Sequence, residues 1–301
     1  MRLTPFAFLA CRLLLAQPVA DHHQHLLQSA AQPPQGFALT AKDLVAQLDQ
    51  AGIQRAVVLS IAYQFGNPNR PPVENEYDRV KAENDWTSQQ AALYPKRLIA
   101  FCSVNPLKDY AIAEIRRCSK DRLLRAGLKL HFGNSDVDLD NPAHVAQIRR
   151  VFKEADRHRM AIVAHIRSTV SRKRPWGAQQ AVVFLNQVLP AARRVPVQIA
   201  HLADAGGYGT EADAALGVFA AAAAANDARM KRVFIDVSGV FAGRWDRHAQ
   251  RIVERLRALG LGRVLYGSDG PTMEAVSGFR KLPLAAEEVR RIETNLAPYL
   301  K

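Results

Sequence analysis

The chain has 301 residues, of which 48% are hydrophobic and 23% are charged, and this composition excludes a largely disordered protein. No run approaches the roughly 20 apolar residues that a transmembrane helix requires. The formal net charge of +13 is compatible with nucleic acid, an anionic membrane or an anionic substrate. The basic residues are scattered, without a nucleic-acid motif or an aromatic-interleaved stripe, so we expect a small anionic substrate and no nucleic acid.

The first 16 residues, MRLTPFAFLACRLLLA, place a basic residue before an apolar stretch that ends in small residues. This order is typical of a secretory signal peptide, although Arg12 interrupts the apolar part. We therefore expect a signal peptide over 1–16, a mature chain over 17–301 and a periplasmic or secreted location. The alternative is a cytoplasmic protein in which this segment is an ordered extension. The cysteines Cys11, Cys102 and Cys118 form no Cys-x-x-Cys pair and indicate neither a disulfide framework nor a thiolate metal site.

After residue 17 the chain alternates short apolar runs with amphipathic segments. The apolar runs have the length and composition of strands covered on both faces, and they lie at 18–26, 56–60, 98–102, 127–131, 161–165, 197–201, 233–237 and 263–267. The intervening segments have helical spacing or helical propensity, and they lie at 40–52, 76–94, 110–118, 142–158, 179–189, 213–225, 247–259 and from 286 onward. This pattern predicts one parallel (β/α)₈ barrel over 17–301.

In such barrels the chemistry lies at the carboxyl ends of the strands, and here those ends carry polar side chains. On the first strand, alternation places Asp21, His23 and His25 on one face and His22 on the other, where we expect a satisfied core residue. The later strands end in further candidates of the same kind: Lys129 and His131, His165, His201 and Asp269. Neutral imidazoles two residues apart can bind one zinc-like cation.

Taken together, Asp-x-His-x-His on the first strand, single histidines after the fifth and sixth strands, and Gly-Ser-Asp-x-Pro on the eighth resemble the amidohydrolase superfamily. The resemblance is to its amidohydrolase-related branch of metal-dependent hydrolases and decarboxylases, and it covers about residues 17–301. It implies a metallo-dependent hydrolase type of barrel with four ligands of a divalent ion: His23, His25, His165 and Asp269. Zinc suits three imidazoles and a carboxylate, and manganese is the alternative.

The resemblance also implies catalytic roles. A metal ion lowers the pKa of its bound water to about 7, and Asp269 can orient that water and accept its proton. His201 can polarise a substrate carbonyl, protonate the leaving group or bind a second metal. Lys129 resembles a lysine that, when carbamylated, bridges two ions. It can equally bind an anion or form a structural pair, so we expect one ion, or two if Lys129 is carbamylated.

The remaining candidates each have two readings. His131 lines the mouth or contributes to a second metal or substrate site. Arg167 binds a substrate carboxylate or forms a structural ion pair. Asp236 contacts substrate or supports a metal ligand.

We expect hydrolysis of an amide, ester or lactone. Non-oxidative decarboxylation of a carboxylated aromatic or enoic acid is the runner-up, and a non-catalytic ligand-binding barrel is the alternative of another class. A homo-oligomer is compatible with the sequence.

Overall fold

The computed structural model describes residues 17–27, 38, 40–168, 174–204, 207–241 and 245–301. The predicted signal peptide therefore lies outside the described residues. The described chain forms one eight-stranded parallel sheet in the sequential order β1 to β8, which confirms the predicted barrel. The strands are β1 (Ala20–Gln24), β2 (Arg55–Leu59), β3 (Leu98–Ser103), β4 (Gly127–His131), β5 (Ala161–His165), β6 (Val197–Ile199), β7 (Val233–Asp236) and β8 (Val264–Leu265).

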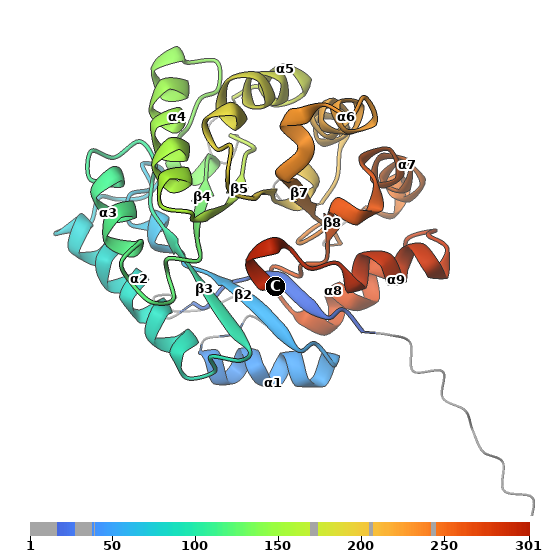
Figure 1. Cartoon of the computed structure of the whole chain (residues 1–301), viewed down its shortest axis with the longest axis horizontal. Coiled ribbons are helices and arrows are strands. Elements are labelled where there is room, and N and C mark those ends of the chain that lie inside the picture. The colour runs from blue at the N-terminus through green and yellow to red at the C-terminus, as the bar shows by residue number, and fades with distance from the viewer. Residues whose placement is uncertain (1–16, 28–37, 39, 169–173, 205–206, 242–244) are drawn as a thin grey trace, which may run out of the picture.

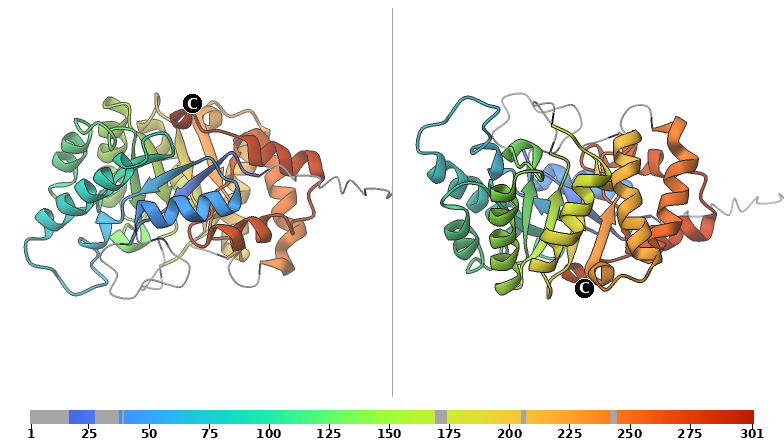
Figure 2. Two further views of the ribbon diagram at one scale, coloured as in Figure 1. Left: turned by 90° about the horizontal axis from the view of Figure 1, so that it is seen from below. Right: turned by 90° about the horizontal axis from the view of Figure 1, so that it is seen from above.

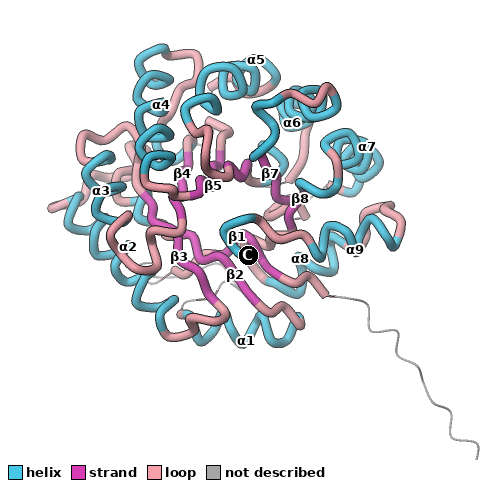
Figure 3. Tube along the Cα trace, viewed as in Figure 1, coloured by secondary structure: helices cyan, strands magenta, loops and turns pink. Residues whose placement is uncertain are grey.

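Helices surround this sheet on its outer side (Figures 1 and 3). They are α1 (Ala41–Ala51), α2 (Glu76–Ala92), α3 (Ala111–Cys118), α4 (Pro142–Arg157), α5 (Ala178–Val183), α6 (Thr210–Ala224), α7 (Ala249–Leu259), α8 (Thr272–Phe279) and α9 (Ala286–Thr294). Sequence reasoning missed α8, a short helix directly after the Gly-Ser-Asp-x-Pro motif. Among the described residues, no helix is both long and apolar enough to cross a bilayer.

Local sequence explains where the helices begin and end. Thr40 caps α1 by accepting a hydrogen bond from the Asp43 backbone N–H, while the Asp43 carboxylate accepts from the Thr40 N–H. Gly52 then ends α1 with φ 69°, a left-handed value that glycine adopts at little cost. The apolar stripes of the helices pack against the outer faces of the strands and form the main core.

Between β8 and β1, backbone hydrogen bonds complete the barrel. The His22 N–H donates to the Tyr266 carbonyl at 3.0 Å, and the Asp269 N–H donates to the His23 carbonyl at 2.8 Å. At the amino ends of the strands, a small apolar cluster fills the barrel interior and includes Leu300 from the chain terminus. The C-terminus therefore marks this end of the barrel (Figure 2). The candidate site residues lie at the other end, which we call the mouth.

One disulfide joins the barrel wall to its helical layer, contrary to our expectation from the sequence. Cys102 on β3 pairs with Cys118 at the end of α3, with a Cα–Cα distance of 6.1 Å. Spacing alone did not indicate this pair, because a strand and the following helix bring residues 16 positions apart into contact only when the βα unit is packed.

Candidate metal centre

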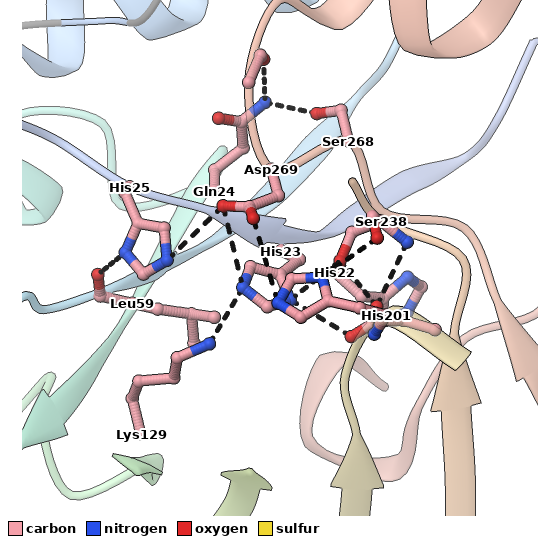
Figure 4. Close-up of polar contacts among 12 residues, drawn as sticks. His22, His23, Gln24, His25, Leu59, Lys129, His201, Ser238, Ser268 and Asp269 are labelled. Carbon is pink, nitrogen blue, oxygen red and sulfur yellow. Dashed lines mark hydrogen bonds and ion pairs between the residues drawn. The ribbon is translucent and has the colours of Figure 1, made fainter. Parts of the chain in front are cut away.

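His23 and His25 at the end of β1 each present one ring nitrogen to the carboxylate of Asp269 (Figure 4). Nδ1 of His23 lies 3.1 Å from Oδ2 of Asp236, and Nδ1 of His25 lies 2.6 Å from the Leu59 carbonyl. Because both partners are acceptors, each Nδ1 carries the proton and each Nε2 keeps its lone pair. The two Nε2 atoms lie 3.8 Å and 3.5 Å from Oδ1 of Asp269.

Asp269 follows β8 in a left-handed conformation with φ 52°. A non-glycine residue there costs energy, and the hydrogen bond from its N–H to the His23 carbonyl holds it in place. Its side chain is 26% exposed, whereas that of His23 is fully buried. Asp269 is therefore the member of the cluster that solvent and a ligand can reach.

His201 joins the cluster from a left-handed turn that begins directly after β6. His201, Leu202 and Ala203 have φ values of 57°, 51° and 66°, which L-residues rarely adopt in succession. The His201 N–H donates to Oδ1 of Asp236 at 2.9 Å, and Nδ1 lies 2.9 Å from the Ser238 carbonyl. Nε2 of His201 then faces Oδ2 of Asp269 at 3.8 Å, so a third imidazole lone pair points at the same carboxylate.

Asp236 lies behind these imidazoles and does not line a substrate surface. Its side chain is fully buried, and its oxygens accept from His23, Gln198, Ser238 and the His201 backbone at 2.5–3.1 Å. With both oxygens engaged, no acceptor is left for a substrate. These contacts favour the second interpretation of Asp236, as support for a metal ligand, over contact with a substrate. Asp236 holds the His23 ring and the His201 backbone in place through these hydrogen bonds, an arrangement typical of residues that support metal ligands.

His165 on β5 lies near the cluster, but its ring nitrogens do not belong to either of the two sets of candidate ligand atoms that lie closest together. The candidate ligand atoms of His23, His25 and Asp269 lie within 4.8 Å of one another, as do those of His23, His201 and Asp236. The His165 ring lies 5.0 Å from that of His201, and its Nε2 is buried without a hydrogen-bond partner. A buried imidazole nitrogen without a partner is costly, so this atom fits a ligand that the protein alone does not provide.

Lys129 and His131, both on β4, flank the cluster differently. Nζ of Lys129 lies 2.9 Å from Nε2 of His23, at the lone pair that a metal would use. The His131 ring stacks on His165 with centroids 3.8 Å apart, and its Nδ1 accepts from the Asn134 N–H. His131 therefore packs beside the cluster, whereas Lys129 points into it.

Burial sets the protonation states of this site. It lowers the pKa of His23 to about 4 and that of His25 to about 3, so both imidazoles are neutral at pH 7, as metal ligands must be. Burial also lowers the pKa of Lys129 to about 8. For Asp269, burial alone would raise the pKa, but His23, His201 and His25 outweigh it and keep the group ionised.

Arg167, two residues beyond His165, forms an ion pair with Asp204 and so ties the connection after β5 to the connection after β6. This contact agrees with the interpretation of Arg167 as a member of a structural ion pair. Its guanidinium is 30% exposed and its Nε is buried without a hydrogen-bond partner, so it retains donors for a substrate carboxylate. His22 has the expected core role, since Nδ1 pairs with the Tyr266 carbonyl and Nε2 accepts from the Ala297 N–H.

Sequence reasoning missed several supporting residues. Asp21 accepts from the backbone N–H groups of His23 and Ser268, at 3.0 Å and 3.1 Å, and so joins β1 to the loop that carries Asp269. The Gln24 amide donates to Ser268 Oγ at 2.5 Å, and Ser238 Oγ donates to Asp236. The alternation that places Asp236 and Ser238 on one face of a strand could have indicated that Ser238 contacts Asp236. No local signal marks Gln24.

A parallel barrel with histidines and an aspartate converging at its mouth defines the class of metal-dependent barrel enzymes. A family model described as amidohydrolase matches residues 20–286, and the chain belongs to that family. It is accordingly an enzyme. No curated protein sequence matches the chain.

Solved structures share the fold at low sequence identity. A 2,6-dihydroxybenzoate decarboxylase complexed with 2,6-dihydroxybenzoate has a TM-score of 0.67 at 16% identity, covering 93% of this chain and 97% of that one. A dihydroxybenzoic acid decarboxylase from Polaromonas, with bound manganese and 2-nitroresorcinol, has 0.62 at 14%, covering 93% and 95%. A probable 2-pyrone-4,6-dicarboxylic acid hydrolase from Acinetobacter baumannii, with citric acid bound, has 0.55 at 16%, covering 92% and 96%.

Proposed function

We propose that this enzyme binds one divalent metal ion at its mouth and hydrolyses an amide, ester or lactone of a small anionic substrate. The observation that carries the metal site is the orientation of His23 and His25. Each Nδ1 donates to an oxygen acceptor, so each Nε2 lone pair faces the carboxylate of Asp269. The unpartnered Nε2 of His165 supports a fourth ligand. Three imidazoles and a carboxylate favour zinc, and the manganese in the Polaromonas structure makes that ion the alternative.

Lys129 bears on how the ion binds. Its ammonium donates to the His23 lone pair that the metal needs, so a charged Lys129 and the ion compete for Nε2 of His23. Binding of the ion requires that Lys129 move or lose its charge. Carbamylation would remove the charge of Lys129 and would add a bridging ligand for a second ion. His201 and His131 are the candidate neighbours of that second ion. We favour one ion because no carboxylate other than Asp269 and the occupied Asp236 joins the described cluster.

In the proposed reaction the ion supplies Lewis acidity to a water or a substrate carbonyl. Asp269 accepts a proton from the attacking water, since it is ionised and is the solvent-accessible member of the cluster. The Nε2 lone pair of His201, which faces Asp269, takes up that proton from Asp269 and delivers it to the leaving group. Arg167 binds a substrate carboxylate with the donors that its pairing with Asp204 leaves available.

Decarboxylation is the second candidate, and the solved structures favour it. Two of the structures named above are decarboxylases of hydroxylated aromatic acids, with such an acid or its nitro analogue bound. The same side chains could bind an aromatic carboxylate and deliver a proton to carbon. Membership of the amidohydrolase family argues against the third reading, a barrel that only binds a ligand.

Elemental analysis of the purified protein tests the metal site. We expect stoichiometric metal in the native protein and loss of metal in His25→Ala. The matched control His144→Ala, at the partly exposed start of α4, should keep its metal. Equal metal content in all three proteins would contradict this site.

Substrate screening in ¹⁸O-labelled water then separates the two reactions. Lactones and esters should yield products that carry solvent oxygen if the enzyme is a hydrolase. Release of carbon dioxide from an aromatic carboxylate, without incorporation of solvent oxygen into the organic product, would establish the decarboxylase instead.

We also propose that the protein is exported. The Cys102–Cys118 disulfide supports this location, because disulfides persist in oxidising compartments and are rare in the cytosol. N-terminal sequencing of the native protein tests the predicted removal of residues 1–16. An intact Met1 on protein from the cytosolic fraction would contradict export.

A further inference from the structure

A line of polar contacts runs through the barrel interior from the candidate metal centre to the chain terminus. Asp236, which holds the ring of His23, also accepts a hydrogen bond from the Gln198 amide at 2.5 Å. The Gln198 carbonyl oxygen in turn accepts from the hydroxyl of Tyr299. Tyr299 lies in a short 3₁₀ helix (Pro298–Leu300) at the amino ends of the strands. We call Asp236, Gln198 and Tyr299 the interior column, and it connects the two ends of the barrel.

The surroundings of the Gln198 amide determine which of its atoms faces which neighbour. Two acceptors face its nitrogen, the Asp236 carboxylate at 2.5 Å and the His22 carbonyl at 3.3 Å. Only the amide nitrogen can donate to them, so the amide oxygen faces Tyr299. Because that oxygen cannot donate, the Tyr299 hydroxyl is the donor of the contact. Burial raises the pKa of Tyr299 well above its usual value, so the hydroxyl keeps the proton that it donates.

The helical turn that carries Tyr299 is held by packing at the amino end of the barrel. The side chain of Arg55, at the start of β2, donates to the Leu300 carbonyl. The Leu300 side chain is fully buried in the apolar cluster at this end. The Tyr299 ring meets that of Phe101 on β3 edge to face, with centroids 5.1 Å apart. The place of the hydroxyl is therefore set from the amino end of the barrel and not from the metal centre.

Loss of this hydroxyl would leave the Gln198 oxygen without a donor. Gln198 is fully buried, and among the residues that the structure describes no other group donates to its side-chain oxygen. A buried acceptor without a donor costs free energy, which favours turning of the amide away from its present orientation. Asp236 would then lose the donor that fixes Oδ2, the same oxygen that holds Nδ1 of His23.

We propose that Tyr299 and Gln198 are positioning residues for the metal ligand His23. This inference rests on the proposed metal site. Both residues act through Asp236, by keeping its Oδ2 where the Nδ1–H of His23 needs an acceptor. Nε2 of His23 then stays aimed at Asp269, as a ligand atom must be. Outer partners of metal-binding histidines tune the affinity of the site in this way.

The first test needs no metal. In metal-free protein labelled with ¹⁵N-histidine, comparison with His23→Gln assigns the Nδ1–H signal of His23. Because Lys129 faces Nε2 of His23, we expect the same tautomer in every variant. The readout is therefore the hydrogen bond from His23 to Asp236, which gives Nδ1–H a downfield position and slow exchange with solvent. Tyr299→Phe should move this signal upfield and speed its exchange.

An unchanged His23 signal in Tyr299→Phe would overturn the proposal. This outcome differs from failure of the proposed metal site. If the native protein bound no divalent ion, the metal site would be wrong, but the response of His23 to Tyr299→Phe would still measure the positioning role.

Zinc titration of the folded protein measures the consequence for binding. We expect Tyr299→Phe to weaken zinc binding about 3- to 10-fold, less than a change at Asp236, which contacts the ligand directly. Gln198→Met keeps the length of the side chain but cannot donate, and should weaken binding about 10-fold. Since Tyr299 acts through Gln198, Gln198→Met/Tyr299→Phe should bind zinc as Gln198→Met does. Additive losses in the double variant would contradict the coupling.

Leu300→Ala is the matched structural control. It removes a buried apolar side chain from the same helical turn and leaves the interior column intact. We expect it to lower the thermal stability at least as much as Tyr299→Phe, while the zinc affinity and the His23 signal stay native. If Leu300→Ala weakened zinc binding as much as Tyr299→Phe, general packing of the turn would control the site, and the positioning role would be refuted.

Discussion

Asp236 accepts a hydrogen bond from Nδ1 of His23 at 3.1 Å, although the two residues are 213 positions apart in the chain. This contact places the proton on Nδ1 and leaves the Nε2 lone pair facing Asp269. The other oxygen of Asp236 holds the His201 backbone at 2.9 Å. A single buried carboxylate thus orients two of the imidazoles at the mouth.

We predict that Asp236→Asn weakens metal binding about 10- to 100-fold, because an amide no longer ensures that His23 donates from Nδ1. Isothermal titration with zinc and with manganese measures the change. The control Asp246→Asn alters an exposed carboxylate beyond the end of β7 and should keep the native affinity. Unchanged affinity in Asp236→Asn would show that the carboxylate does not orient a ligand.

The amino end of the barrel depends on the absence of a side chain at Gly127. A Cβ atom there would lie 2.1 Å from Cε2 of the buried Phe101 ring. Gly127→Ala should therefore lower the free energy of unfolding by about 3 kcal/mol, as overpacked cores do. Urea denaturation measures this loss, and Phe101→Leu in the same chain should recover part of it. Gly209→Ala is the control, since the nearest atom to a Cβ at that position would be Glu211 Oε2 at 3.7 Å.

The disulfide between β3 and α3 should contribute to stability, because it restricts the unfolded chain between residues 16 positions apart. We expect Cys102→Ser/Cys118→Ser to lower the free energy of unfolding by about 2–4 kcal/mol. Reduction of the native protein by dithiothreitol should produce the same loss in urea denaturation. A native protein whose stability does not respond to the reductant would contradict the pairing.

Asp213 at the start of α6 links that helix to α7. It accepts from Arg255 at 2.8 Å and 2.9 Å, from Arg251 at 2.9 Å and from Tyr208 at 3.0 Å. The hydrogen bonds from Arg255 lead the interactions that hold the pKa of Asp213 well below its usual value. A lowered folded-state pKa stabilises the protein above the unfolded-state pKa of about 4, and this contribution is lost as the pH falls further.

Asp213→Asn should therefore cost about 1–3 kcal/mol of unfolding free energy at pH 7. The difference from the native protein should shrink as the pH is lowered below about 4. Thermal or urea denaturation over a pH series measures both effects. Asp78→Asn, at a 69% exposed side chain paired with Lys81, should change stability by less than about 0.5 kcal/mol. If the difference in unfolding free energy between the two proteins grew as the pH fell, the pKa of Asp213 would not be lowered by folding.

The sequence by itself determined the barrel and the end at which its polar residues gather. Apolar runs such as 56–60 and 161–165 are buried on both faces, and this burial depends only on local composition and spacing. Because all parallel strands of a barrel end on the same side, His23, His165, His201 and Asp269 had to lie near one mouth. The core role of His22 followed from the alternation of side chains along β1.

Only the tertiary structure decided which atoms meet. The acceptors that select the tautomers of His23 and His25 come from β7 and β2, and no spacing along β1 specifies them. Asp236 lies behind His23 because of the register among β6, β7 and β8. The disulfide depends on the packing of α3, and the left-handed turn at His201 is held by contacts with β7. Strand formation is driven by local burial, whereas these pairings depend on barrel closure, which brings residues far apart in the chain within hydrogen-bond distance.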